Sequence, residues 1–147
     1  MIRTARNTEL DKMIELYKHL HRADVHAQLD DLRRVWTEML ESQFLHCFVT
    51  EEDDQLVSSC VLVLVPNLTR GAKPYGLIEN VVTHTDHRNR GLATRLIQYV
   101  LNFAWQRGAY KVMLLTGSKN PAVHRLYEKV GFNGHSKKGY VIANPRV

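Results

Sequence analysis

The most apolar part of the chain consists of two short runs, residues 45–50 and 56–65, which are dense in β-branched and aromatic side chains. The polar segment 51–55 separates them. This arrangement predicts a β-hairpin, because apolar runs of strand length on either side of a polar turn tend to pair. A hairpin of this kind needs elements that cover it, so the rest of the chain is constrained to build layers around a sheet.

Segments with a helical period lie on both sides of the predicted hairpin. Apolar residues recur at helical spacing over 10–17, 29–42 and 92–107, and a last helix is predicted from Pro121 to Val130. Further strands are predicted at residues 2–5, 77–83, 110–116 and 140–143. The continuous apolar run at 110–116 is expected to be buried on both faces. The order β-α-α-β-β-β-α-β-α-β predicts an α/β (α+β) fold, a mixed central sheet flanked by helices.

The length and charge of the chain limit its organisation and its partners. We expect one domain over residues 1–147, because no repeat, low-complexity tract or linker divides the sequence. The formal net charge is +5 and the pI is near 9.4. Since the Lys and Arg residues are scattered, a solvated basic surface is favoured over a nucleic-acid site, and a phosphate-rich cofactor remains an alternative.

No apolar run approaches the roughly 18 residues that cross a bilayer, and residues 1–6 lack the apolar core of a signal peptide. We therefore expect a cytoplasmic protein without a membrane partner. Cys47 and Cys60 are too few for a disulfide framework and are interpreted as buried free thiols. They fall in adjacent predicted strands, so whether they lie close together stays open.

The segment from Glu79 to Thr94 combines a strand, a tight basic loop and the start of a helix. Backbone N–H groups at a helix start have no partner within the helix, so they can bind phosphate oxygens. Gly91 lets a ligand approach the backbone, and Arg88 and Arg90 add positive charge. The segment is neither a P-loop nor a G-x-G-x-x-G fingerprint. These residues alone leave an anion site and a solvated basic loop as equal alternatives.

A second block, residues 120–132, favours one interpretation of the first, because both blocks resemble motifs of the same family. Arg88-x-x-Gly91-x-Ala93 resembles the acetyl-CoA pyrophosphate loop of the GNAT superfamily of N-acetyltransferases, although Ala93 replaces a commoner glycine and Thr85 stands where proline is frequent. The second block is similar to the closing motif of the same family in Asn120, Leu126-Tyr127, Lys129 and Gly131-Phe132. One helix and one strand separate the two motifs, as in the family.

The resemblance implies a cofactor site for acetyl-CoA. It implies that the strand at Val81, Val82 and Thr83 separates from residues 110–116 and pairs with the pantetheine arm. It implies that the loop backbone holds the pyrophosphate through Arg88, Asn89, Arg90, Gly91, Leu92, Ala93 and Thr94. Asn120 is expected to bond the arm, although a helix cap before Pro121 would explain it equally.

The resemblance also implies catalytic roles. Tyr127 is expected to lie near the cofactor's sulfur and to protonate the leaving thiolate, although a half-buried core tyrosine would look the same. Glu79 is the expected base for the amine, because strand alternation places it on the face shared by Val81 and Thr83. An ion-paired carboxylate, with water as the base, is the alternative. The backbone N–H near Val82 is expected to polarise the carbonyl.

Two connections are expected to shape the acceptor pocket. The histidine-rich connection from His19 to His26 contributes His21, and the loop 67–76 contributes Tyr75. No metal site is expected. His84 and His87 are interpreted as surface histidines without a third ligand nearby in sequence, and a metal requirement in the His19–His26 connection stays open.

Together these features predict an acetyl-CoA-dependent N-acetyltransferase that acetylates a primary amine of a small molecule by direct transfer in a ternary complex. No cysteine lies in either motif, which argues against an acetyl-cysteine intermediate. The alternatives are a protein N-terminus or lysine as acceptor, or a non-catalytic acyl-CoA-binding sensor. A homodimer is compatible with the sequence, and the acceptor's identity is left open.

Overall fold

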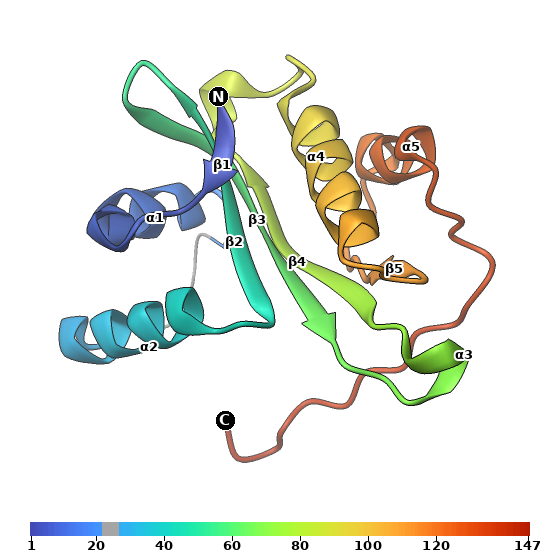
Figure 1. The fold of residues 1–147 in the computed structure, drawn as a ribbon. Helices are drawn as coiled ribbons and strands as arrows, with labels where there is room; N and C mark the ends of the chain where they lie inside the picture. Colours follow the sequence, from blue (N-terminus) through green and yellow to red (C-terminus); the bar gives the residue numbers. More distant parts are fainter. Residues whose placement is uncertain (22–26) are drawn as a thin grey trace.

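The protein is known from a computed structural model that describes residues 1–21 and 27–147. Within these residues the chain forms a five-stranded sheet (Figure 1). The strands lie side by side in sequence order, β1 (Ile2–Thr4), β2 (Leu45–Glu52), β3 (Gln55–Val65), β4 (Tyr75–Thr83) and β5 (Val112–Leu114). The first four run antiparallel, and β5 runs parallel to β4 because a helix returns the chain between them. The predicted hairpin and the mixed sheet are confirmed.

Helices cover the two faces of the sheet. The structure has α1 (Leu10–Tyr17), α2 (Leu29–Glu41), the short turn α3 (Thr69–Ala72), α4 (Leu92–Gln106) and α5 (Pro121–Val130), with 3-10 turns η1 (Asn7–Glu9) and η2 (Thr85–His87). Figure 1 shows α1 and α2 on one face and α4 and α5 on the other. Among the described residues, no helix has both the length and the hydropathy that a bilayer span requires.

Each face of the sheet has its own core, because successive side chains of a strand point to opposite faces. Under α4 the buried side chains are Phe48, Cys60, Leu62, Leu64, Ile78, Leu96, Ile97, Val100 and Ala104. Under α1 and α2 they are Met13, Leu16, Trp36, Cys47, Val49, Leu56, Val61 and Val82. The side chain of a strand residue can therefore be assigned to the α4 face or to the α1–α2 face.

The two cysteines lie on opposite faces of the sheet. Cys60 is opposite Phe48 in the β2–β3 register and packs under α4, whereas Cys47 packs under α1 and α2. Both are buried free thiols. Burial raises the pKa of Cys47 to about 11 and raises that of Cys60 as well. Adjacent strands thus hold two unreactive thiols that the sheet keeps apart.

Two predictions for the C-terminal third of the chain are wrong. Residues 140–143 form no strand, and Tyr140, Val141 and Ile142 are 84–95% exposed. The run 110–116 was predicted to be buried on both faces, but it forms only the short strand β5, whose residues are half-buried. The reason is that α1 and α2 pack over β2 and β3 and leave the α1–α2 face of β5 uncovered (Figure 1).

Candidate active site

An extra residue interrupts β4 at the centre of the candidate site. The β3–β4 register pairs Val61 with Glu79 and Ser59 with Val82, so two residues of β4, Asn80 and Val81, stand against one residue of β3. Asn80 has a φ of 52°, in the left-handed region. This is a β-bulge, a feature that re-aims the side chains on either side of it.

The bulge corrects the predicted orientation of Glu79. Directly opposite residues of an antiparallel pair share a face, so Glu79 lies with Val61 on the α1–α2 face. Val81 packs under α4 together with Ile78, and Thr83, next to Ser58, is on that face as well. The prediction that Glu79 shares a face with Val81 and Thr83 is therefore wrong, because the additional residue shifts the alternation.

The strands β4 and β5 pair only over a short length. Their register ends at Ile78 and Leu114, while β4 continues to Thr83. Beyond this point, β5 does not continue along the backbone of residues 79–83 in the described chain. An edge of this kind can accept an extended ligand through main-chain hydrogen bonds.

The loop after β4 leads directly into α4. Gly91 precedes the first residue of α4 with a φ of 73°, which a glycine adopts without steric cost. No side chain caps this helix start, so its first N–H groups point outward without an intrahelical partner. The residues 88–91 are exposed, Leu92 is buried, and Ala93 and Thr94 are half-buried. The loop can hold an anion at the positive end of the helix dipole.

The two arginines of the loop brace it internally. Arg88 donates from Nε to the carbonyl of Thr83 and from Nη2 to the carbonyl of His19, both at 3.2 Å. Arg90 pairs with Glu52 at 3.0 Å and donates to His87 Nδ1 at 2.7 Å. The two guanidinium groups thus fix the shape of the loop and place positive charge beside it. Sequence reasoning missed Glu52, which comes from the β2–β3 hairpin and carries no motif.

The histidines near the loop form a ring cluster with α1. The rings of His19 and His84 lie 4.0 Å apart, and those of His84 and His87 lie 5.4 Å apart. No group of three potential ligands that could hold a metal ion occurs within residues 1–21 and 27–147. His21 is exposed at the end of the described part of its connection, and Asp24 and His26 lie outside the described residues. The cluster connects the end of α1 to the loop.

Tyr127 approaches the bulge from α5. Its ring packs, half-buried, against the α4-face core and against Phe132, with ring centroids 6.1 Å apart. Burial first, then the charges of Cys60 and Glu79, raise the pKa of its hydroxyl. The shift favours the protonated form, so at neutral pH the hydroxyl is a hydrogen-bond donor.

The start of α5 uses Asn120 as a helix cap. Its Oδ1 accepts the N–H of Ala122 at 2.9 Å, and Pro121 is the first residue of the helix. The structural interpretation of Asn120 thus has direct support. A cofactor contact would have to use the amide nitrogen of the same side chain.

Tyr75 lies at the other end of β4. It precedes Glu79 by four residues, about 13 Å along the strand, on the same α1–α2 face. Lys111 Nζ lies 5.4 Å from the centroid of its ring, and the ring of Tyr110 lies 6.4 Å away. Tyr75 and Leu77 are half-buried and Glu79 is exposed, so the three form a row along β4 with Tyr75 at the end away from the bulge.

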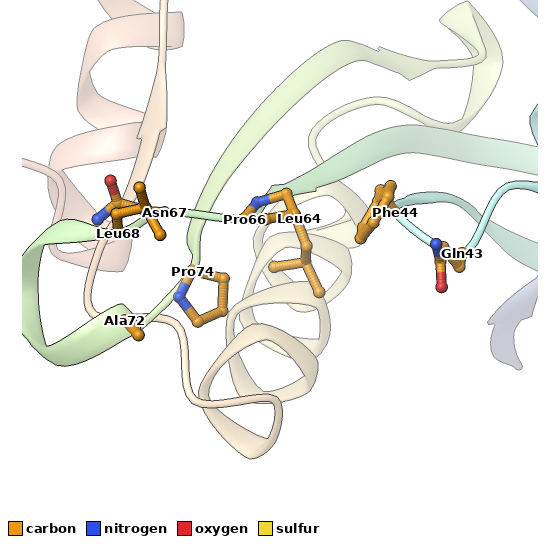
Figure 2. A pocket seen from close by; sticks show the side chains of 8 residues that line it. All are labelled: Gln43, Phe44, Leu64, Pro66, Asn67, Leu68, Ala72 and Pro74. Carbon is orange, nitrogen blue, oxygen red and sulfur yellow. The ribbon is translucent and has the colours of Figure 1, made fainter.

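A cavity of about 470 Å³ lies at the end of the sheet where β3 passes to β4 (Figure 2). Its lining is Gln43, Phe44, Leu64, Pro66, Asn67, Leu68, Ala72 and Pro74. None of these side chains is an acid or a base, so the cavity is not a reaction centre. A second cavity of about 430 Å³ lies between α1 and the β2–β3 turn and includes His19 and His84.

Ser58 is a site residue that sequence reasoning missed. Its Oγ donates to the carbonyl of Val82 at 2.8 Å and lies 3.0 Å from Thr83 Oγ1. It is fully buried. These contacts fix the end of β4 just after the bulge. The only signal in the sequence was a pair of serines, Ser58 and Ser59, within an otherwise apolar strand.

Comparisons with known proteins agree with this architecture. Residues 10–132 match the acetyltransferase (GNAT) family. Glucosamine 6-phosphate N-acetyltransferase of Trypanosoma brucei brucei is 30% identical over 93% of this chain and 91% of its own length. N-alpha-acetyltransferase 30 of Schizosaccharomyces pombe is 26% identical over 79% of this chain and 80% of its own length. The solved structure of an assigned acetyltransferase from Agrobacterium tumefaciens str. C58 has a TM-score of 0.92 at 38% identity, covering 98% of this chain and 99% of that one.

Proposed function

Because the chain belongs to the acetyltransferase (GNAT) family, whose members are acetyl-CoA-dependent acyltransferases, we propose that it acetylates a primary amine of a small molecule by direct transfer in a ternary complex. One observation carries the proposal. At the bulge of β4, a proton donor approaches from the α4 face and a carboxylate lies on the α1–α2 face. The two groups flank a strand edge that an extended ligand can join.

The proposed acetyl-CoA site combines the loop and this edge. The pyrophosphate lies on the N–H groups that begin α4, within the segment from Arg88 to Thr94. The pantetheine arm pairs with the backbone of Val81, Val82 and Thr83, along the part of β4 that β5 does not reach. The amide nitrogen of Asn120 donates to the arm, since the oxygen is used by the helix cap. The exposed Gly91 turn and the uncapped helix start support this assignment.

The proposed chemistry needs one acid and one base. The amine nitrogen attacks the thioester carbonyl carbon, the C–S bond breaks, and the backbone N–H near Val82 stabilises the developing oxyanion. Glu79 accepts the proton of the amine, directly or through water, and Tyr127 gives its proton to the leaving thiolate. The half-buried position of Tyr127 against the α4-face core, on α5, supports the acid role. The burial and raised pKa of both cysteines argue against an acetyl-cysteine intermediate.

The proposed acceptor site is the part of the α1–α2 face that no helix covers. Tyr75, Leu77 and Glu79 line it from β4, and Lys111 adds a positive charge. His21 faces this site from the connection after α1 in our proposal. A small amine is favoured because the relative that is 30% identical over 93% of the chain is named for glucosamine 6-phosphate. The N-alpha-acetyltransferase relative makes a protein N-terminus the second candidate.

We further propose that residues 1–147 act as one domain and that the protein works in the cytoplasm. Two observations support the single domain. The match to the family spans residues 10–132, and the helices form their two cores on opposite faces of one sheet. The two buried free thiols support a reducing compartment.

Release of free thiol from acetyl-CoA across a panel of amines tests the function. The panel contains glucosamine 6-phosphate, a polyamine, amino acids, an aminophosphonate, and peptides with a free N-terminus or a lysine. Fastest turnover with a small amine supports the proposal, and a peptide as the best acceptor would replace it with the protein acetyltransferase. Binding of acetyl-CoA without turnover of any amine would favour a non-catalytic sensor.

A further inference from the structure

Two cations lie on two tyrosine rings at the end of β4 that is distant from the bulge. Lys111 Nζ lies 5.4 Å from the ring centroid of Tyr75 and 5.3 Å from that of Tyr110, and the two rings are 6.4 Å apart. Arg70 from α3 lies over the Tyr110 ring, with its Cζ 6.0 Å from the centroid. These four side chains, here called the basic–aromatic cluster, connect α3 with the start of β4 and the residues just before β5.

No carboxylate neutralises the two cations. Within the described chain, the side chains of Lys111 and Arg70 form neither an ion pair nor a hydrogen bond. The segments 55–78 and 87–127, which carry the cluster, contain no Asp or Glu. Lys111 is half-buried, and the rings compensate only part of the cost of removing its charge from water. The N–H donors of both cations are therefore available to an external anion.

The basic–aromatic cluster lies on the same face of the sheet as Glu79. Val112 and Leu114 pack against the α4-face core, so alternation places Lys111 on the α1–α2 face, beside Tyr75. Tyr75 precedes Glu79 by four residues, about 13 Å along β4. Because α1 and α2 pack over β2 and β3, they leave this part of the face uncovered (Figure 1). One small molecule can thus reach from Glu79 to the cluster.

We propose that Lys111 and Arg70 bind an anionic group of the acceptor, a phosphate or a carboxylate, while the amine of the acceptor lies at Glu79. This inference rests on the proposed function and names the chemical class of the amine. Ammonium and guanidinium groups both bind oxyanions through charge-assisted hydrogen bonds. The acceptor then has a cationic end that faces a carboxylate and an anionic end that faces the cluster. Such complementarity fixes the direction of the acceptor along β4.

Two matched pairs of acceptors test the anionic group. Glucosamine 6-phosphate and glucosamine differ by a phosphate, and 6-aminohexanoate and hexylamine differ by a carboxylate. We expect a higher kcat/KM, measured by thiol release at low salt, for the anionic member, and the pair that shows it identifies the anion. Lys111→Met should lower this kcat/KM about 10- to 100-fold, the worth of a hydrogen bond to a charged group, and leave that of the neutral member nearly unchanged.

Three variants separate charge recognition from a structural role of the cluster. Lys111→Arg keeps the charge and should keep the preference for the anion. Arg70→Asn should weaken the preference, and asparagine tolerates the φ of 57° at this position. Lys73→Met is the matched control, because Lys73 is exposed in the same loop and contacts neither ring in the described chain; it should leave the preference unchanged. Circular dichroism checks that all variants stay folded.

The proposal is overturned by a wild type that prefers the anionic member of neither pair. It is also overturned if Lys111→Met impairs both members of a pair equally, as a structural role predicts, or if Lys73→Met reduces the preference as much as Lys111→Met does.

Calorimetric titration of the anionic acceptors into the CoA complex reads binding without acetyl transfer. CoA occupies the proposed pyrophosphate loop, so the anion is not drawn to that site. Weaker binding to Lys111→Met, together with no turnover of any amine by the wild type, would retain the anion site and reject the proposed activity. Turnover of amines without any dependence on the anionic group would retain the activity and reject the site.

Discussion

The substitution of Gly91 by Asp, compared with Gly91→Asn, tests the anion site most directly. Gly91 has a φ of 73°, and Asp and Asn both tolerate this left-handed conformation better than other residues. A Cβ at Gly91 would meet only Arg95 Nη1, at 3.4 Å. The two variants therefore share backbone and steric costs and differ by one negative charge. Asp also caps helices well, so its effect on binding would not come from unfolding.

The size of the effect follows from the exposure of the loop. Because residues 88–91 are exposed, the effective dielectric constant lies between that of a protein surface and that of water. At a separation of about 5 Å, a carboxylate and a phosphate charge then repel by roughly 1–3 kcal/mol. This corresponds to a Kd about 5- to 150-fold higher for Asp than for Asn. Contact of the carboxylate with Arg95 favours the lower half of this range.

Calorimetric titration with CoA at low salt measures the difference. We expect Gly91→Asn to bind within a few-fold of the wild type and Gly91→Asp to bind more weakly. The gap should narrow as salt rises, because screening weakens exposed charges. Equal affinity of the two variants at low salt would refute the assignment of the pyrophosphate to this loop.

Four further outcomes follow from the structure. Tyr127→Phe should lower kcat by about 10²- to 10⁴-fold with little change in CoA affinity, measured by steady-state kinetics and calorimetry. Glu79→Gln should lower kcat/KM for the amine most at low pH, where the amine is protonated, and recover above the amine's own pKa; identical pH–rate profiles would assign the deprotonation to water. Tyr75→Ala should raise the KM of the acceptor and leave that of acetyl-CoA nearly unchanged, and so should His21→Ala; the reverse pattern would place the acceptor elsewhere. Glu9→Gln should reduce the free energy of unfolding in urea at pH 7 by roughly 3 kcal/mol, because it leaves the part-buried Arg3 with one carboxylate fewer.

The last of these outcomes has a defined pH dependence. The hydrogen bond from Arg3 lowers the pKa of Glu9 below its ordinary value of 4.5. The stabilisation is therefore complete above about pH 4.5 and is lost as the pH falls through the lowered pKa. The wild type should lose stability over this acid range, and Glu9→Gln should lose less. Parallel losses in both proteins would show that other carboxylates dominate.

For the kinetic predictions, conservative changes away from the bulge serve as controls. Tyr99→Phe removes a hydroxyl from the exposed side of α4, so it should leave kcat unchanged. Glu128→Gln removes a carboxylate from the exposed surface of α5 next to Tyr127, so its pH–rate profile should match that of the wild type. Full kcat in Tyr127→Phe, with chemistry rate-limiting, would contradict the acid role.

Local patterns in the sequence determined most of the elements and the order in which they follow. The hairpin, the periodic helices and the loop that enters α4 at Gly91 depend on interactions between near neighbours, which spacing and residue type report. The cap of Asn120 and Pro121 is local in the same sense. The two family motifs follow from these local features, because each lies at one strand–loop–helix junction.

Only the tertiary structure decided how distant segments meet. The bulge at Asn80 appears in the register with β3, and it moves Glu79 to the face opposite Val81. Glu52 and His19 reach the loop from segments far away in sequence, so no spacing could reveal them. The strand predicted at 140–143 is missing for the same reason: strand propensity is local, but a strand forms only where a partner offers unpaired N–H and C=O groups.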